Sequence, residues 1–200
     1  MNRWSLGILL SAAMAATMFA AVKPNDAAPD FSVKASLAGK AFDYSLKAAL
    51  KKGPVVVYFY PSAFTGGCNI EAHTFAENKE KFDAAGASII GVSRDSIARL
   101  NAFSADPQYC AGKIAVASDP DGAVATSYGL TKRDLTPGMK DTRGVEIDHA
   151  FTERTTFVVT PDGKVAATFS SADDKISPAD HVEKSLAVVQ RLASSSSPKH

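Results

Sequence analysis

The chain has 200 residues, of which 46% are hydrophobic and 22% charged, and its formal net charge is +1. This length and composition suit one well-packed domain. Beyond residue 20, 21 basic side chains are balanced by 21 acidic ones. Neither nucleic acid nor an anionic membrane surface is therefore expected as a partner.

The N-terminus has the pattern of an export signal. Arg3 precedes an apolar stretch over residues 6–21, and no further charge follows before Lys23. Such a stretch is typical of a cleaved signal peptide, here residues 1–21. An uncleaved membrane anchor is the alternative, although the stretch reaches only the lower limit of about 17 residues for a span. We expect an exported, periplasmic protein with no stable membrane association after cleavage.

The following elements are short and are separated by Gly, Pro and Asp. After a linker over residues 22–30, they are expected in chain order as a hairpin (31–37 and 41–44), a helix (46–51), a buried strand (55–60), a helix (69–85), a strand (87–93), a helix capped by Asp95, a strand (114–118), a short helix ending near residue 128, a polar surface segment (131–150), a hairpin (155–159 and 165–169) and a final helix from Ser177. Residues 31–193 are expected to form the domain and residues 194–200 a disordered tail.

This order predicts an α/β fold. Alternating strands and helices, closed by an antiparallel hairpin and a helix, indicate a central mixed β-sheet with helices on both faces and an N-terminal β-hairpin. The order is similar to that of a thioredoxin-like core, which carries its reactive cysteine at a strand-to-helix junction.

Cys68 lies at such a junction, after a buried strand and a turn rich in Gly and Pro. Free backbone N–H groups and the positive end of the helix dipole favour the thiolate there, which is the reactive form of cysteine. Cys68 is therefore predicted to be a nucleophile. The other cysteine, Cys110, could pair with it in a disulfide or remain a free thiol. No metal or cofactor is expected, because the spacing of the two cysteines fits no zinc motif and the four histidines are scattered.

The residues around Cys68 resemble a known family. Tyr58-Phe59-Tyr60-Pro61-x-x-x-Thr65-x-x-Cys68 is similar to the Pro-x-x-x-Thr-x-x-Cys signature of peroxiredoxins, which are thiol peroxidases with a thioredoxin-like fold. Residues 68–75, 90–96 and 117–122 resemble the peroxiredoxin Q, or bacterioferritin comigratory protein, branch of the alkyl hydroperoxide reductase/thiol-specific antioxidant family. Residues 154–158 resemble the arginine strand of that family, and the likeness extends over about residues 27–192.

The resemblance implies a role for each residue of the motif. Cys68 would attack the peroxide O–O bond, and the Thr65 hydroxyl would hydrogen-bond the peroxide and the sulfur. Arg154 would stabilise the thiolate and the charge of the transition state, Pro61 would shield the sulfur from water, and Glu71 would orient the arginine. Taken singly, these residues also have structural interpretations: Thr65 as a helix cap, Pro61 as a strand terminator and Arg154 as a solvated charge.

The resemblance also bears on how the reaction cycle closes. Attack leaves a sulfenic acid on Cys68, which a second thiol can condense with. Many members of the branch carry that resolving cysteine five residues later, where this chain has His73. Cys110 is the remaining candidate, and local opening would be needed for it to reach Cys68. The alternative is a bystander Cys110 with resolution by an external thiol. The loop also reads Thr-Gly-Gly-Cys where the branch usually has Thr-Pro-Gly-Cys.

We therefore expect an exported peroxidase that reduces hydrogen peroxide and organic hydroperoxides and is re-reduced by a thioredoxin-type donor, as a monomer or a dimer. A thiol–disulfide oxidoreductase would need Cys-x-x-Cys, and Glu71 occupies the second position. A copper chaperone would need Cys-x-x-x-Cys, and Ala72 occupies that position. A redox-sensing or purely binding protein on the same fold is a further alternative, against which the set of Thr65, Cys68 and Arg154 argues.

Overall fold

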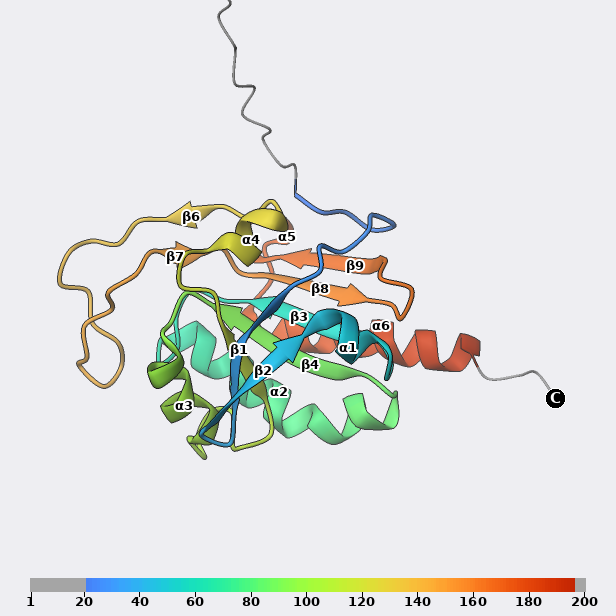
Figure 1. Cartoon of the computed structure of the whole chain (residues 1–200), viewed down its shortest axis with the longest axis horizontal. Coiled ribbons are helices and arrows are strands. Elements are labelled where there is room, and N and C mark those ends of the chain that lie inside the picture. Colours follow the sequence, from blue (N-terminus) through green and yellow to red (C-terminus); the bar gives the residue numbers. More distant parts are fainter. Residues whose placement is uncertain (1–20, 197–200) are drawn as a thin grey trace, which may run out of the picture.

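The computed structural model describes residues 21–196 (Figure 1). The predicted signal peptide, apart from Ala21, and the last four residues of the predicted tail lie outside this range. The elements are β1 (Ser32–Leu37), β2 (Lys40–Ser45), α1 (Leu46–Leu50), β3 (Val55–Phe59), α2 (Gly66–Ala84), β4 (Ser88–Ser93), α3 (Ile97–Ala105), β5 (Ala115–Ser118), α4 (Ala123–Ser127), β6 (Lys132–Arg133), β7 (Phe151–Thr152), β8 (Thr155–Val159), β9 (Val165–Ser170), α5 (Ser171–Asp174) and α6 (Pro178–Ser196). Between residues 21 and 196, no helix is both long and apolar enough to cross a membrane.

A seven-stranded mixed sheet forms the centre of the molecule, in the order β2-β1-β5-β4-β3-β8-β9. The three inner strands β3, β4 and β5 run parallel to one another. The hairpin of β1 and β2 joins β5 antiparallel at one edge, and the hairpin of β8 and β9 joins β3 antiparallel at the other. The predicted α/β class with a mixed sheet and an N-terminal hairpin is confirmed.

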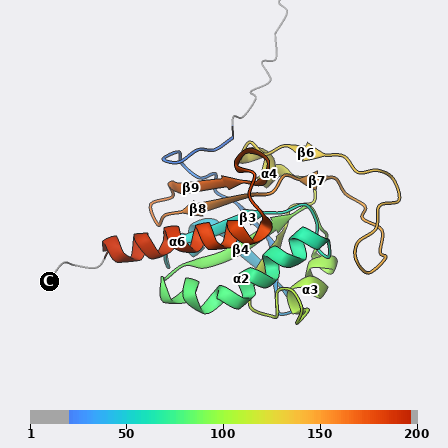
Figure 2. The ribbon, with the colours of Figure 1, turned by 180° about the vertical axis from the view of Figure 1, so that it is seen from behind.

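Helices cover both faces of the sheet. Strand β3 is therefore buried on both sides, and its alternate side chains enter two different cores. Val55, Val57 and Phe59 pack with residues of α1 and α4. Val56 and Tyr58 enter the other core, under α2, α3 and α6. Figure 2 shows these three helices lying over the same face of the sheet.

The starts of two predicted helices differ from the structure. Helix α2 begins at Gly66, three residues before the expected start, so Cys68 lies inside its first turn. Helix α3 is capped by Ser96, whose Oγ accepts a hydrogen bond from the Arg99 amide at 3.3 Å, and the expected cap Asp95 is wrong. The serine fills the cap position because Asp95 is buried and engaged in other hydrogen bonds.

The segments expected to be a linker, a disordered tail and a surface excursion each differ in part from that expectation. Residues 22–30 lie along the hairpin of β8 and β9. The amides of Asn25 and Ala28 donate to the carbonyls of Val165 and Gly163, both at 2.8 Å. Helix α6 continues to Ser196, past the expected end of the domain at residue 193. The polar segment 131–150 lies largely on the surface, yet it buries the side chain of Ile147.

Candidate functional site

Cys68 lies in the first turn of α2, and only 2% of the residue is exposed. The chain reaches it through a loop that starts at Pro61, shortly after β3 ends, and Pro61 itself is half-buried. Thr65 occupies the N-cap position with an extended backbone, but its hydroxyl makes no cap hydrogen bond. The hydroxyl donates instead to the Ser62 carbonyl at 2.8 Å, which closes the loop just before the helix.

Arg154 contacts Cys68 from the residue just before β8. The residue directly precedes β8, and Thr155 of β8 pairs with Phe59 at the end of β3, which places Arg154 beside the start of α2. Its Nη2 donates a hydrogen bond to the Cys68 Sγ at 3.2 Å. A guanidinium at this distance is placed to stabilise negative charge that develops at the sulfur. Arg154 is therefore not the solvated charge of the structural interpretation, since only 10% of its side chain is exposed.

Glu71, one turn further along α2, holds the same guanidinium. Its Oε2 accepts from Arg154 Nη1, and its side chain is fully buried. Burial raises the pKa of Glu71 to about 7, while the charge of Arg154 opposes that rise. Burial also lowers the pKa of Arg154, but the charges of Glu71 and Cys68 raise it above its ordinary value, so the guanidinium stays charged.

His181 in α6 supports the same region and was not predicted. The ring is fully buried, and its Nδ1 and Nε2 lie 3.0 Å from the Thr156 hydroxyl and 2.9 Å from the Ser171 hydroxyl. Burial, together with the charge of Arg154, lowers the pKa of His181 to about 4. The neutral ring therefore fixes the start of α6 to β8 and α5 next to Arg154.

Cys110 lies in the turn that follows α3 and is fully buried, and its thiol is free, as is that of Cys68. Burial raises the pKa of the Cys110 thiol. Both cysteines belong to the core cluster under α2, α3 and α6. The structure therefore brings Cys68, Arg154 and Glu71 into contact and keeps Cys110 inside the core, unpaired.

A second polar cluster, not predicted from the sequence, fixes the loop before Cys68. Asp95 follows β4 and is buried; it accepts hydrogen bonds from the Ser62 hydroxyl at 2.9 Å and from the Ala63 amide at 2.7 Å. His149 Nε2 lies 2.9 Å from its Oδ1. Although burial raises the pKa of Asp95, the hydrogen bond and charge of His149 lower it overall. The only sequence signal for this cluster is an acidic residue two positions after a buried strand, and the same position also suits a helix cap.

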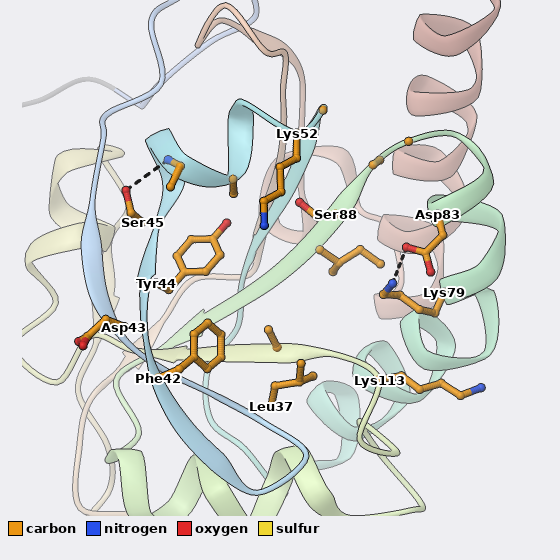
Figure 3. Close-up of a pocket in the computed structure, with 17 residues that line it drawn as sticks. Leu37, Phe42, Asp43, Tyr44, Ser45, Lys52, Lys79, Asp83, Ser88 and Lys113 are labelled. Atoms are coloured by element: carbon orange, nitrogen blue, oxygen red, sulfur yellow. Dashed lines mark hydrogen bonds and ion pairs between the residues drawn. The ribbon is translucent and has the colours of Figure 1, made fainter.

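A cavity of about 660 Å³ lies away from this chemistry (Figure 3). It is lined by Leu37, Phe42 and Tyr44 of the first hairpin and by Lys79 and Asp83 near the end of α2. Cys68 is at the other end of that helix. In the described part of the chain, no group of three or more His, Cys, Asp or Glu side chains is placed to hold a metal ion.

Comparison with known proteins gives consistent results. The model of the AhpC/TSA family matches residues 24–168. Peroxiredoxin Bcp of Xanthomonas campestris is 32% identical over 139 residues, which are 70% of this chain and 78% of that protein. The chloroplastic peroxiredoxin Q of Populus jackii is 28% identical over 188 residues, covering 94% of this chain and 78% of the relative.

A solved structure extends the likeness to the fold. The crystal structure of peroxidoxin BcpB from Mycobacterium tuberculosis superposes with a TM-score of 0.70 and 30% sequence identity. The match covers 86% of this chain and 98% of that one.

Proposed function

The chain belongs to the AhpC/TSA family and is a thiol-dependent peroxidase of the peroxiredoxin Q and Bcp type, and we propose that Cys68 is the residue that attacks the peroxide. The observation that carries this proposal is the 3.2 Å hydrogen bond from Arg154 to the Cys68 sulfur at the start of a helix. A charged donor and a helix N-terminus both stabilise the thiolate that such an attack requires.

In the proposed reaction, the Cys68 thiolate attacks one oxygen of the peroxide and the O–O bond breaks. The sulfur becomes a sulfenic acid, and the other oxygen leaves as hydroxide or alkoxide and takes up a proton. Arg154 stabilises the developing negative charge, and Glu71 orients Arg154 through the paired guanidinium. Thr65 would hydrogen-bond the bound peroxide, and Pro61 would limit access of water to the sulfur.

Cys110 is proposed to resolve the sulfenic acid. Its thiol would displace the sulfenic hydroxyl, so that a Cys68 and Cys110 disulfide and one water molecule form. Since Cys110 is fully buried and both thiols are free in the reduced structure, the step requires local opening of the chain. A thioredoxin-type dithiol would then reduce the disulfide and restore both thiols.

We also propose that the protein is exported and acts in the periplasm. The support is the sequence of residues 1–21, a single Arg followed by an apolar stretch without acidic residues. Mass measurement of the protein recovered from a periplasmic extract checks this, because an intact Met1 N-terminus would contradict cleavage.

The proposed chemistry is tested by peroxide consumption with dithiothreitol as the reductant. Wild type is expected to turn over, and Cys68→Ser to fall to the rate of a protein-free control, because a serine hydroxyl is not ionised at neutral pH. Cys110→Ser is the matched control. It should retain reaction with the first equivalent of peroxide but form no intramolecular disulfide. Wild-type turnover by Cys68→Ser would contradict the proposal.

A further inference from the structure

The side chain of Phe64 links the Cys68 loop to the turn that carries Cys110. Phe64 is 1% exposed, and its ring packs edge-to-face against Phe103 and Tyr109, with centroid distances of 5.0 and 5.7 Å. Tyr109 directly precedes Cys110. The loop before Cys68 and the Cys110 turn are thus held together by one aromatic cluster.

Two residues of the polar segment 131–150 hold Phe64 in this position. The Arg143 guanidinium lies over the Phe64 ring, 3.2 Å from its centroid. The neighbouring Thr142 donates its amide and its hydroxyl to the Phe64 carbonyl, at 2.9 and 2.8 Å. Ring and backbone of Phe64 are therefore both held from the polar segment 131–150.

Arg143 is itself fixed by a buried carboxylate. Asp141, whose side chain is fully buried, accepts from Arg143 Nε at 3.1 Å and from Nη2 at 2.8 Å. The same oxygen of Asp141 accepts from Arg99 Nη2 at 2.7 Å, and Arg99 lies in α3, the helix that leads to Cys110. Arg99 Nη2 also donates to the Ala63 carbonyl at 3.0 Å. Asp141 thus links the segment 131–150 to α3 through Arg99, and Arg99 in turn links α3 to the loop before Cys68.

The backbone of Phe64 needs these contacts. Its φ is +62°, in the left-handed region that residues with a Cβ rarely adopt. Such a conformation persists only where surrounding contacts hold it, so removing a contact favours release of the loop.

We propose that Arg143 is a positioning residue that keeps Phe64 seated and so controls how often the Cys110 turn opens. The consequence for the redox cycle rests on the proposed function, because opening is what would bring the Cys110 thiol to the sulfenic acid of Cys68. The opening itself is a property of the fold and is measurable without peroxide.

The test measures how fast N-ethylmaleimide adds to the Cys110 thiol in a Cys68→Ser background, read by mass. Because a buried thiol reacts only when the turn opens, the rate reports the population of the open state. Arg143→Ala is expected to raise the rate at least about fivefold, as loss of a cation–π contact and a paired charge implies. Arg143→Lys keeps the charge but loses the flat stacking on Phe64. Its labelling rate should therefore lie between the rates of the parent and of Arg143→Ala.

Two control variants separate this effect from a general loss of stability. Arg133→Ala removes a longer cation–π contact from the same segment, in which the Arg133 guanidinium lies 5.2 Å from the Phe151 ring centroid. Val159→Ala truncates the core on the other face of the sheet. Both should leave labelling of Cys110 at the rate of the parent.

An unchanged labelling rate in Arg143→Ala, or an equal rise in Val159→Ala, would overturn the proposal. With Cys68 intact, Arg143→Ala should also speed disulfide formation after one equivalent of hydrogen peroxide. If labelling responds to Arg143→Ala and no disulfide ever forms, the positioning role of Arg143 stands and the proposed resolving role of Cys110 fails.

Discussion

The two glycines before Cys68 have different physical roles. A Cβ added at Gly67 would lie 3.2 Å from Arg154 Nη2 and 3.3 Å from Pro178 Cγ, so the absence of a side chain lets the guanidinium approach the helix start. A Cβ at Gly66 would meet nothing within 4 Å. Space around the site therefore favours a glycine at the second position, whereas the first position has room for a side chain.

Gly66→Pro is expected to stabilise the protein by about 0.4–1 kcal/mol, because proline restricts the unfolded chain. Gly66 is the first residue of α2, where proline is favoured and no intrahelical acceptor exists for its N–H. Thr65 has φ −110° and ψ 149°, a conformation that suits a residue before proline. Urea unfolding measures the change. Gly67→Ala is the matched control and should destabilise, and a loss of stability in Gly66→Pro would contradict this account of the helix start.

At the level of elements, the start of α3 and the segment 131–150 are joined by the ion pair of Asp95 and His149. Although burial lowers the pKa of His149, the hydrogen bond and charge of Asp95 raise it overall. A raised histidine pKa contributes stability that is fully present below the ordinary value of about 6.5 and is lost as the pH rises through the folded value. The pKa of Asp95 is lowered, so that carboxylate is ionised throughout this window.

His149→Gln is therefore expected to cost on the order of 1 kcal/mol more free energy of unfolding at pH 5.5 than at pH 9. Urea unfolding of both proteins at the two pH values gives this difference, and the acid response of His181 cancels because both chains contain it. His73→Gln is the control, since His73 is exposed and its ion pair with Glu77 lies at the surface. A cost for His149→Gln that is equal at both pH values would show that the charge on His149 contributes nothing.

The elements that the sequence predicted correctly are those with a local pattern. The buried strand over residues 55–60 and the hairpin around Asp162-Gly163 appear as β3 and as the pair of β8 and β9. Helix α5 has four residues, too few for a periodicity to show, and it was missed. Asp95 was misassigned because Asp95 and Ser96 both favour a cap position, and only the tertiary contacts of Asp95 decide between them.

At the scale of the whole molecule, the sheet explains which parts of the site could be predicted. The antiparallel pairing of β3 with β8 carries Arg154 to Cys68, and the sequence indicated this contact only through the resemblance of residues 154–158 to the arginine strand of the family. The contact of Asp95 with His149 joins residues 54 apart, and it leaves no periodic pattern in the sequence. The same holds for Arg143 over Phe64, because the segment carrying Arg143 is irregular and docks through the ring contact of Arg143 and the hydrogen bonds of Thr142 to the Phe64 carbonyl.

The most direct test of the central claim is a single turnover of the reduced protein with one equivalent of hydrogen peroxide and no reductant. Wild type is expected to consume the peroxide and lose the thiols of both Cys68 and Cys110, and Cys68→Ser should leave the peroxide unconsumed. Consumption by Cys68→Ser at the wild-type rate, or no consumption by wild type, would contradict the assignment of Cys68 as the peroxide-reducing residue.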